Sequence, residues 1–172
     1  MLEALIFVVF PFCMLFAAIS DMLSMTIANR VPVLLVVVFA LVAPLTGMEW
    51  AAYGWHFAAG AIVLSVTFGL FAIGGMGGGD AKLLAATAVW MGLNINLVEY
   101  LVASTIIGGL LTLAILIYRK SPLAVVTGRN PFLRHFADEK TGVPYGIALG
   151  LGGLMTYPDS PLVVWALARL AS

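Results

Sequence analysis

The sequence contains few charged residues for its length. Asp, Glu, Lys and Arg make up 9% of its 172 residues, whereas 63% are hydrophobic. A soluble domain of this size carries more polar surface, and a disordered chain has fewer apolar residues, so the composition excludes both classes. The formal net charge is zero, so the charge balance gives no indication of a nucleic-acid partner. The composition instead predicts an all-α, polytopic membrane protein, with membrane lipid as its surroundings.

Cysteine and histidine are also scarce. Cys13 is the only cysteine, which excludes a disulfide within the chain and a thiolate zinc site, and we interpret it as a small core residue. His56 falls within a long apolar run and His135 in a basic loop, and neither has an evident nucleophile as a partner. A metal site would need more ligands than these two histidines provide. We therefore predict no metal and no cofactor.

Long apolar runs, by contrast, are plentiful. A helix that crosses a bilayer needs about 20 mostly apolar residues. We predict about six spans, at approximately residues 2–20, 31–48, 51–73, 81–97, 99–118 and 143–158, in one membrane-embedded domain over residues 1–172. The fourth run is the weakest, because Gly92, Asn94 and Asn96 interrupt it, and whether it crosses fully is open. The tail from Pro161 to Leu170 is too short to cross again and is predicted to rest at the interface.

The basic residues are distributed unequally between the two sides of this layout. With six spans, one side receives seven of the eight basic residues: Arg30, Lys82, Arg119, Lys120, Arg129, Arg134 and Lys140. The other side keeps only Arg169, and the positive-inside rule then places the basic side in the cytoplasm. The first run lacks the basic flank of a signal peptide, so we interpret it as a retained span with its N-terminus outside.

Two aspartates follow spans that end on the predicted cytoplasmic side. Asp21 comes directly after the first span, and Asp80 directly after five glycines between Gly74 and Gly79 that end the third span. Two crossings separate the aspartates, so both are predicted at the same membrane face and at similar depth. For Asp21 alone, a carboxylate at the aqueous end of a helix is a sufficient explanation. For Asp80 the structural alternative is an N-cap of the helix that starts at Ala81.

The glycines favour a functional interpretation of Asp80. They offer no side chains to fill space, so they serve either backbone freedom or close approach of another group. Two carboxyls within about 3 Å of each other share a proton and titrate as a unit. One can then activate water as a base while the other, protonated, polarises a carbonyl and protonates the leaving amine. The pair therefore predicts acid–base hydrolysis.

Three motifs in order resemble a known family. Gly77-Gly78-Gly79-Asp80-Ala81-Lys82-Leu83 is similar to the signature of the prepilin peptidases, the membrane aspartic proteases of GxGD type. Asp21 followed by Ile27-Ala28-Asn29 resembles the first motif of that family, with alanine where proline is usual and no basic residue just after the aspartate. Val143-Pro144-Tyr145-Gly146 resembles a third recurrent element. The similarity covers essentially the whole chain.

The resemblance implies a fold, an activity and a location. It implies an aspartic endopeptidase in the bacterial cytoplasmic (inner) membrane, in which Asp21 and Asp80 match the catalytic aspartates. The implied substrate is a type IV pilin precursor with a basic N-terminal leader and a hydrophobic helix, cleaved at the cytoplasmic face without a metal. The chain lacks the cysteine-rich insert of the methylating members, so it resembles the compact branch associated with Flp/Tad pili. The oligomeric state is not indicated.

The residues around the aspartates keep two interpretations each. Lys82 either orients the Asp80 carboxylate or extends to the lipid headgroups. Asn29 either hydrogen-bonds near the site or caps the helix from Arg30. Pro144 suits a first helical turn, and Tyr145 an interfacial aromatic belt, if neither lines the site. Gly146 and Gly150 form a small-residue pair that is typical of close helix packing, as is Gly108-Gly109.

Two functions other than proteolysis remain open from the residues alone. A small proton- or cation-coupled transporter or channel would use the aspartates as ion sites, although such sites are expected near the membrane midplane. A non-catalytic scaffold for pilus assembly would explain the packing glycines but not the paired aspartates.

Overall fold

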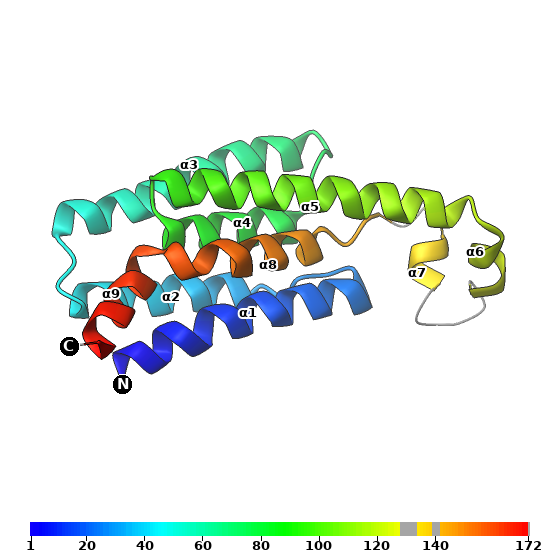
Figure 1. Cartoon of the computed structure of the whole chain (residues 1–172). Helices are drawn as coiled ribbons and strands as arrows, with labels where there is room; N and C mark the ends of the chain where they lie inside the picture. Colours follow the sequence, from blue (N-terminus) through cyan, green and yellow to red (C-terminus); the bar gives the residue numbers. More distant parts are fainter. Residues whose placement is uncertain (128–133, 139–141, 172) are drawn as a thin grey trace.

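A computed structural model describes residues 1–127, 134–138 and 142–171, and within these ranges every regular element is a helix. Five long helices come first: α1 (Leu2–Ser24), α2 (Arg30–Leu45), α3 (Trp50–Ala72), α4 (Gly78–Met91) and α5 (Ile95–Arg119). The short helices α6 (Pro122–Thr127) and α7 (Arg134–Ala137) follow, then α8 (Tyr145–Thr156), the 3-10 turn η1 (Tyr157–Asp159) and α9 (Pro161–Leu170). The long helices lie side by side, and both termini are at the same end of the bundle (Figure 1).

The helix α4 is the centre of the bundle. It packs against α2, α3, α5 and α8, and every residue from Leu83 to Met91 is buried. A helix that is apolar on all sides is stable only when neighbours surround it, which is the position that α4 occupies. The first turn of this enclosed helix carries Asp80, so the carboxyl is held by a rigid element.

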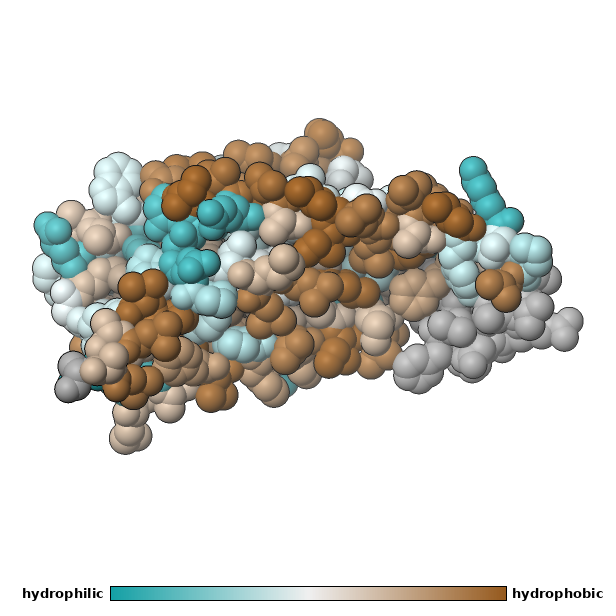
Figure 2. Space-filling model, in the orientation of Figure 1, coloured by the Kyte–Doolittle hydropathy of each residue, from teal (hydrophilic) through white to brown (hydrophobic). Residues whose placement is uncertain are grey.

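Apolar side chains also cover the outside of the bundle, as expected for helices that contact lipid. Large exposed residues include Val8, Leu41, Val66 and Leu110, each more than 60% exposed. Figure 2 shows apolar residues over most of the visible face along the length of the bundle. Within the described ranges, three helices, α1, α3 and α5, are long and apolar enough to cross a membrane, and α2 and α9 are shorter apolar helices. The six-span, N-out topology stays a prediction.

The helices differ in their limits from the predicted first and fourth spans. The helix α1 continues to Ser24, so Asp21 lies within it and not after it. Its buried residues Phe10, Met14, Ala17 and Asp21 recur every three or four positions, which places Asp21 on the face that packs into the bundle.

The fourth predicted span, 81–97, is divided between two helices. The helix α4 starts earlier, at Gly78, and ends at Met91, because Gly92 adopts a positive φ of 78° where a Cβ would lie 2.7 Å from the His56 ring. The side chain of Asn94 then accepts a hydrogen bond from the Asn96 N–H at 2.8 Å and caps α5, which begins at Ile95 and not near 99. With 14 residues, α4 is about 21 Å long, shorter than a bilayer core of about 30 Å.

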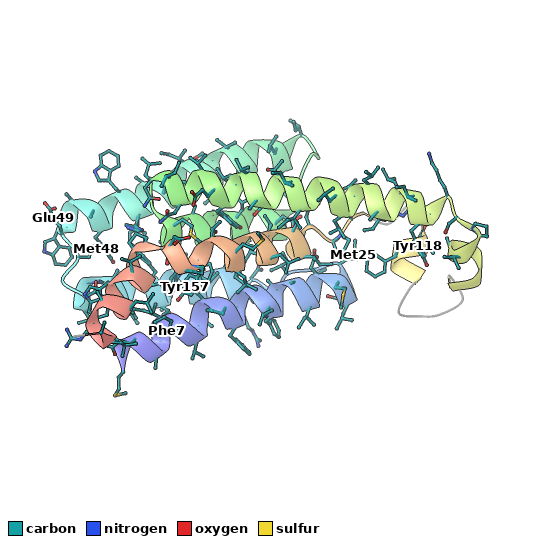
Figure 3. All side chains as sticks on the ribbon, in the orientation of Figure 1. Phe7, Met25, Met48, Glu49, Tyr118 and Tyr157 are labelled. Carbon is teal, nitrogen blue, oxygen red and sulfur yellow. The ribbon has the colours of Figure 1, made fainter. Side chains whose placement is uncertain are left out.

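Aromatic packing closes the end of the bundle that lies far from Asp80. Tyr157 points from η1 into the bundle, where its ring stacks on Phe10 at 4.3 Å and its hydroxyl donates to the Ile6 carbonyl (Figure 3). Arg169 of α9 pairs with Glu3 of α1 at 3.2 Å. Met25, at the other end of α1, is far from Glu49 along the bundle in Figure 3. The two ends therefore differ in chemistry, and the aspartates belong to the Met25 end.

Candidate active site

Asp21 is held at the interface of α1 and α8. Its side chain is only 5% exposed, and its Oδ2 accepts a hydrogen bond from the backbone N–H of Gly146 at 2.7 Å. This N–H is free to donate because Gly146 lies in the first turn of α8, where helical N–H groups have no partner within the helix. A Cβ on Gly146 would lie 2.7 Å from the Asp21 Cβ. A glycine at 146 is therefore required for this approach, and the bond fixes the direction of the carboxylate.

Asp80 occupies the first turn of α4. The N-cap of that helix is Gly77, so Asp80 is the third helical residue, and the structural alternative of an N-cap role is excluded. The residue is half-buried, and its helix is not one of the described helices that are long and apolar enough to cross a membrane. Burial, and secondly the negative charge of Asp21, raise the pKa of the Asp80 carboxyl to about 7. Near neutral pH both the protonated and the ionised form of the Asp80 carboxyl are therefore populated.

The glycines before Asp80 serve close approach more than conformational freedom. Only Gly74 among them has a positive φ, of 76°. A Cβ on Gly77 would lie 2.8 Å from the Asp80 Oδ2, and one on Gly79 would lie 3.2 Å from the Ile27 Cβ. Gly78 faces the Phe71 ring, which its Cβ would meet at 3.3 Å. The sequence pattern was compatible with either backbone freedom or close approach. At residues 77–79 the short distances to neighbouring atoms favour close approach.

Asp21 and Asp80 line the same cavity, of about 290 Å³. Its other lining residues come from the turn after α1 and from the glycine loop: Met25, Thr26, Ile27, Asn29, Gly77, Gly78 and Gly79. The sequence analysis missed Met25 and Thr26 as lining residues. Met25 has a positive φ of 55°, which is rare for a residue with a side chain and has no signature in the sequence. Both aspartates thus lie at the same end of the bundle, and the assignment of this end to the cytoplasmic face stays a prediction.

Lys82 and Asn29 contact each other at the edge of this cavity. Lys82 Nζ donates to Asn29 Oδ1 at 3.0 Å, and both residues are exposed. Asn29 occupies the N-cap position of α2, but its side chain makes no capping bond there. Of the two interpretations for Asn29, a hydrogen bond near the site is the one observed, whereas the hydrogen bond of Lys82 goes to Asn29 and not to Asp80.

The third motif contacts Asp21 through the backbone N–H of Gly146, and residues 143–146 are not among those that line the cavity. Pro144 is buried and is the N-cap residue of α8, and Tyr145 is 37% exposed. A Cβ on Gly108 of α5 would lie 2.6 Å from the Tyr145 ring, so this ring packs against α5. Gly109 has open space around it, and only Gly108 of that pair serves packing.

The described residues bring together no group of three or more His, Cys, Asp or Glu side chains that could hold a metal ion. His56 lies in α3, where its Nδ1 is 2.7 Å from the Val89 carbonyl. For His135 the side chain lies outside the described part of the structure, as do Arg129 and Lys140 entirely. Cys13 is buried and free.

The arrangement is suited to activating water. A water molecule takes about 30 Å³ of liquid volume, so the cavity has room for one beside a short stretch of extended peptide. One carboxyl is oriented by a backbone N–H, and the other has a pKa near neutrality. Two carboxyls in such different environments can divide the roles of base and acid.

Comparison with known proteins adds one match. A family model described as the type IV leader peptidase family matches residues 8–117, well over half of the chain and including both aspartates. Among curated proteins and among solved structures, no match is found.

Proposed function

Because the chain belongs to the type IV leader peptidase family, as its resemblance to the prepilin peptidases predicted, we propose that it is an aspartic endopeptidase acting through Asp21 and Asp80. Membership in the family indicates a peptidase whose substrate is a pilin precursor. The main support for the aspartic mechanism is the shared cavity. Asp21 and Asp80 are 59 positions apart in the sequence, yet both line it. The proposed substrate is a Flp-type precursor with a basic leader and a hydrophobic helix.

The proposed reaction is hydrolysis of one peptide bond by a water in this cavity. The ionised carboxylate takes a proton from the water, and the oxygen attacks the scissile carbonyl carbon. The protonated carboxyl polarises the carbonyl oxygen, and a proton then passes to the leaving nitrogen as the C–N bond breaks. The products are the leader with a new carboxylate and the pilin with a new amine. Since the two acids act as one titrating unit, neither is assigned permanently as the base.

The proposed location is the cytoplasmic face of the bacterial inner membrane, with six spans and the N-terminus outside. It is supported by the cavity that Asp21 and Asp80 share at one end of the bundle and by the positive-inside distribution of Arg and Lys. The compact chain carries no insert that would add methylation, and its proposed role is cleavage alone.

A cleavage assay with a matched acidic control tests this function. The purified protein in detergent or liposomes is mixed with a Flp-type precursor, and the loss of the leader is followed by gel shift. Asp21→Asn and Asp80→Asn are expected to lose cleavage by at least about a thousandfold, because each removes one of the two proton-transfer partners. Asp159→Asn is the control, since Asp159 lies in η1 and does not line the cavity.

Two results would contradict the proposal. Cleavage at the wild-type rate by either Asp21→Asn or Asp80→Asn would exclude the two-aspartate mechanism. Ion flux into liposomes that depends on Asp80, without cleavage by the wild type, would support the transporter interpretation instead.

A further inference from the structure

A second, apolar cavity lies beside the aspartate cavity and is open to the side of the bundle. It has a volume of about 460 Å³ and is formed by α2, α3 and α4. Small residues of α4, Ala85 and Ala86, make its floor, and both are buried. Its walls include Val37 of α2 and Ala61 and Leu64 of α3, all of which are exposed. We call this cavity the α2–α3 groove.

The α2–α3 groove has the length of a short piece of helix. Its lining extends from Asn29 to Val37 along α2 and from Lys82 to Val89 along α4. At a rise of about 1.5 Å per residue these stretches are about 10 to 12 Å long, or roughly two helical turns. Small residues along such a groove let the backbone of another helix approach closely, which is the main source of helix association in lipid.

One end of the groove shares a lining residue with the aspartate cavity. Asn29 lines both cavities, and Lys82, which lines the groove, donates a hydrogen bond to it. The rest of the groove lining is apolar, so Lys82 and Asn29 form its one polar end. An occupant that follows the groove therefore passes from an apolar channel to a polar junction and then to the two carboxyls.

We propose that the α2–α3 groove binds the first two turns of the substrate's apolar helix, directly after the scissile bond. This inference rests on the proposed function and adds the surface that positions the substrate. A protease must hold the scissile segment extended, and an extended backbone in a membrane needs partners for its N–H and C=O groups. The Lys82 ammonium and the Asn29 amide supply such partners where the helix would end. The order of apolar groove, polar junction and carboxyls matches a substrate that is helical, then extended, then cleaved.

Filling the groove tests the proposal. Ala61→Trp places a large ring in the groove, whereas Val66→Trp places one on a lipid-exposed part of α3 that does not line it. For a full precursor, Ala61→Trp is expected to raise KM at least about tenfold, and Val66→Trp to leave it unchanged. A short precursor peptide that ends before the apolar helix should be cleaved equally by the wild type and both variants. Equal cleavage of the full precursor by Ala61→Trp would overturn the groove while leaving the peptidase function intact.

A binding measurement keeps the two proposals separate. A photoactivatable residue is placed at position 64, in the groove, or at position 66 as the control, in an Asp80→Asn background that holds the substrate uncleaved. The proposal expects crosslinks to the precursor's apolar helix from position 64 and none from position 66. Crosslinks from position 64 to lipid alone, or to a second copy of the chain alone, would overturn it. Crosslinks from position 64 to the precursor, together with no cleavage by the wild type, would support the groove as a binding surface and contradict the proposed peptidase activity.

Discussion

Gly146 gives the sharpest test of how the site is built, because its missing side chain makes room for Asp21. In Gly146→Ala the new Cβ would lie 2.7 Å from the Asp21 Cβ, 2.9 Å from Oδ2 and 3.0 Å from Cγ. Carbon atoms normally rest about 3.5 to 4.0 Å apart, so α1 and α8 must separate or Asp21 must turn by about 1 Å. Rotation of the Asp21 carboxyl group alone cannot relieve the overlap, because the nearest atom is the Asp21 Cβ.

Gly146→Ala is expected to lower catalytic activity more than stability. A misplacement of about 1 Å in a reacting group can lower the rate about a hundredfold, so we expect kcat/KM to fall by that order. Overpacking typically costs about 1 to 3 kcal/mol of stability, and the helical preference of alanine over glycine returns about 1 kcal/mol. The variant should therefore remain folded, with a modestly lower melting temperature.

The assay is precursor cleavage in detergent, with the melting temperature measured on the same samples. Gly109→Ala is the matched control, because the same change on α5 meets no atom within 4 Å. It should cleave like the wild type and melt at the same or a higher temperature. A Gly146→Ala variant with wild-type kcat/KM would refute the view that this glycine sets the position of Asp21.

The remaining predictions concern protonation and helix packing. The pKa of Asp80 is about 7 in the folded chain against 3.8 as its ordinary value, so between these pH values the folded state holds more protons than the unfolded state. The free energy of unfolding should therefore fall as pH rises from about 4 to 7, and Asp80→Asn should reduce this fall in a melting series; an identical pH dependence in the variant would contradict it. If cleavage needs the Asp80 proton, kcat/KM should also decline above about pH 7. Gly60→Ala places a Cβ 2.5 Å from Val89 Cγ2 and should lower the melting temperature by separating α3 from α4, whereas Gly69→Ala, with open space around it, should not.

The order of helices and the end of the bundle that carries the aspartates could be predicted from the sequence. Apolar runs of sufficient length are enough to indicate spans, because partition into lipid depends on composition and not on partners. Counting crossings between Asp21 and Asp80 then puts both acids at the same end. The motifs around them add the family, which the match over residues 8–117 confirms.

Helix limits were less predictable because they depend on contacts outside the helix. The end of α4 follows from the His56 ring, which leaves no room for a Cβ at Gly92. Asp21 was expected at an aqueous helix end, and the continuation of α1 to Ser24 instead buries it against α8. In both cases the deciding neighbour is more than 30 positions away in the sequence.

By itself, then, the sequence determined the membrane class, the succession of apolar helices and the pair of acids at one end, since these depend on hydropathy and on the parity of crossings. Only the tertiary structure decided that Gly146 directs Asp21, that Lys82 bonds Asn29, and that a groove over α4 shares Asn29 with the aspartate cavity. The physical reason is that these contacts join segments that are distant in the sequence. Which helices pack together depends on the whole bundle, and a local sequence pattern does not specify it.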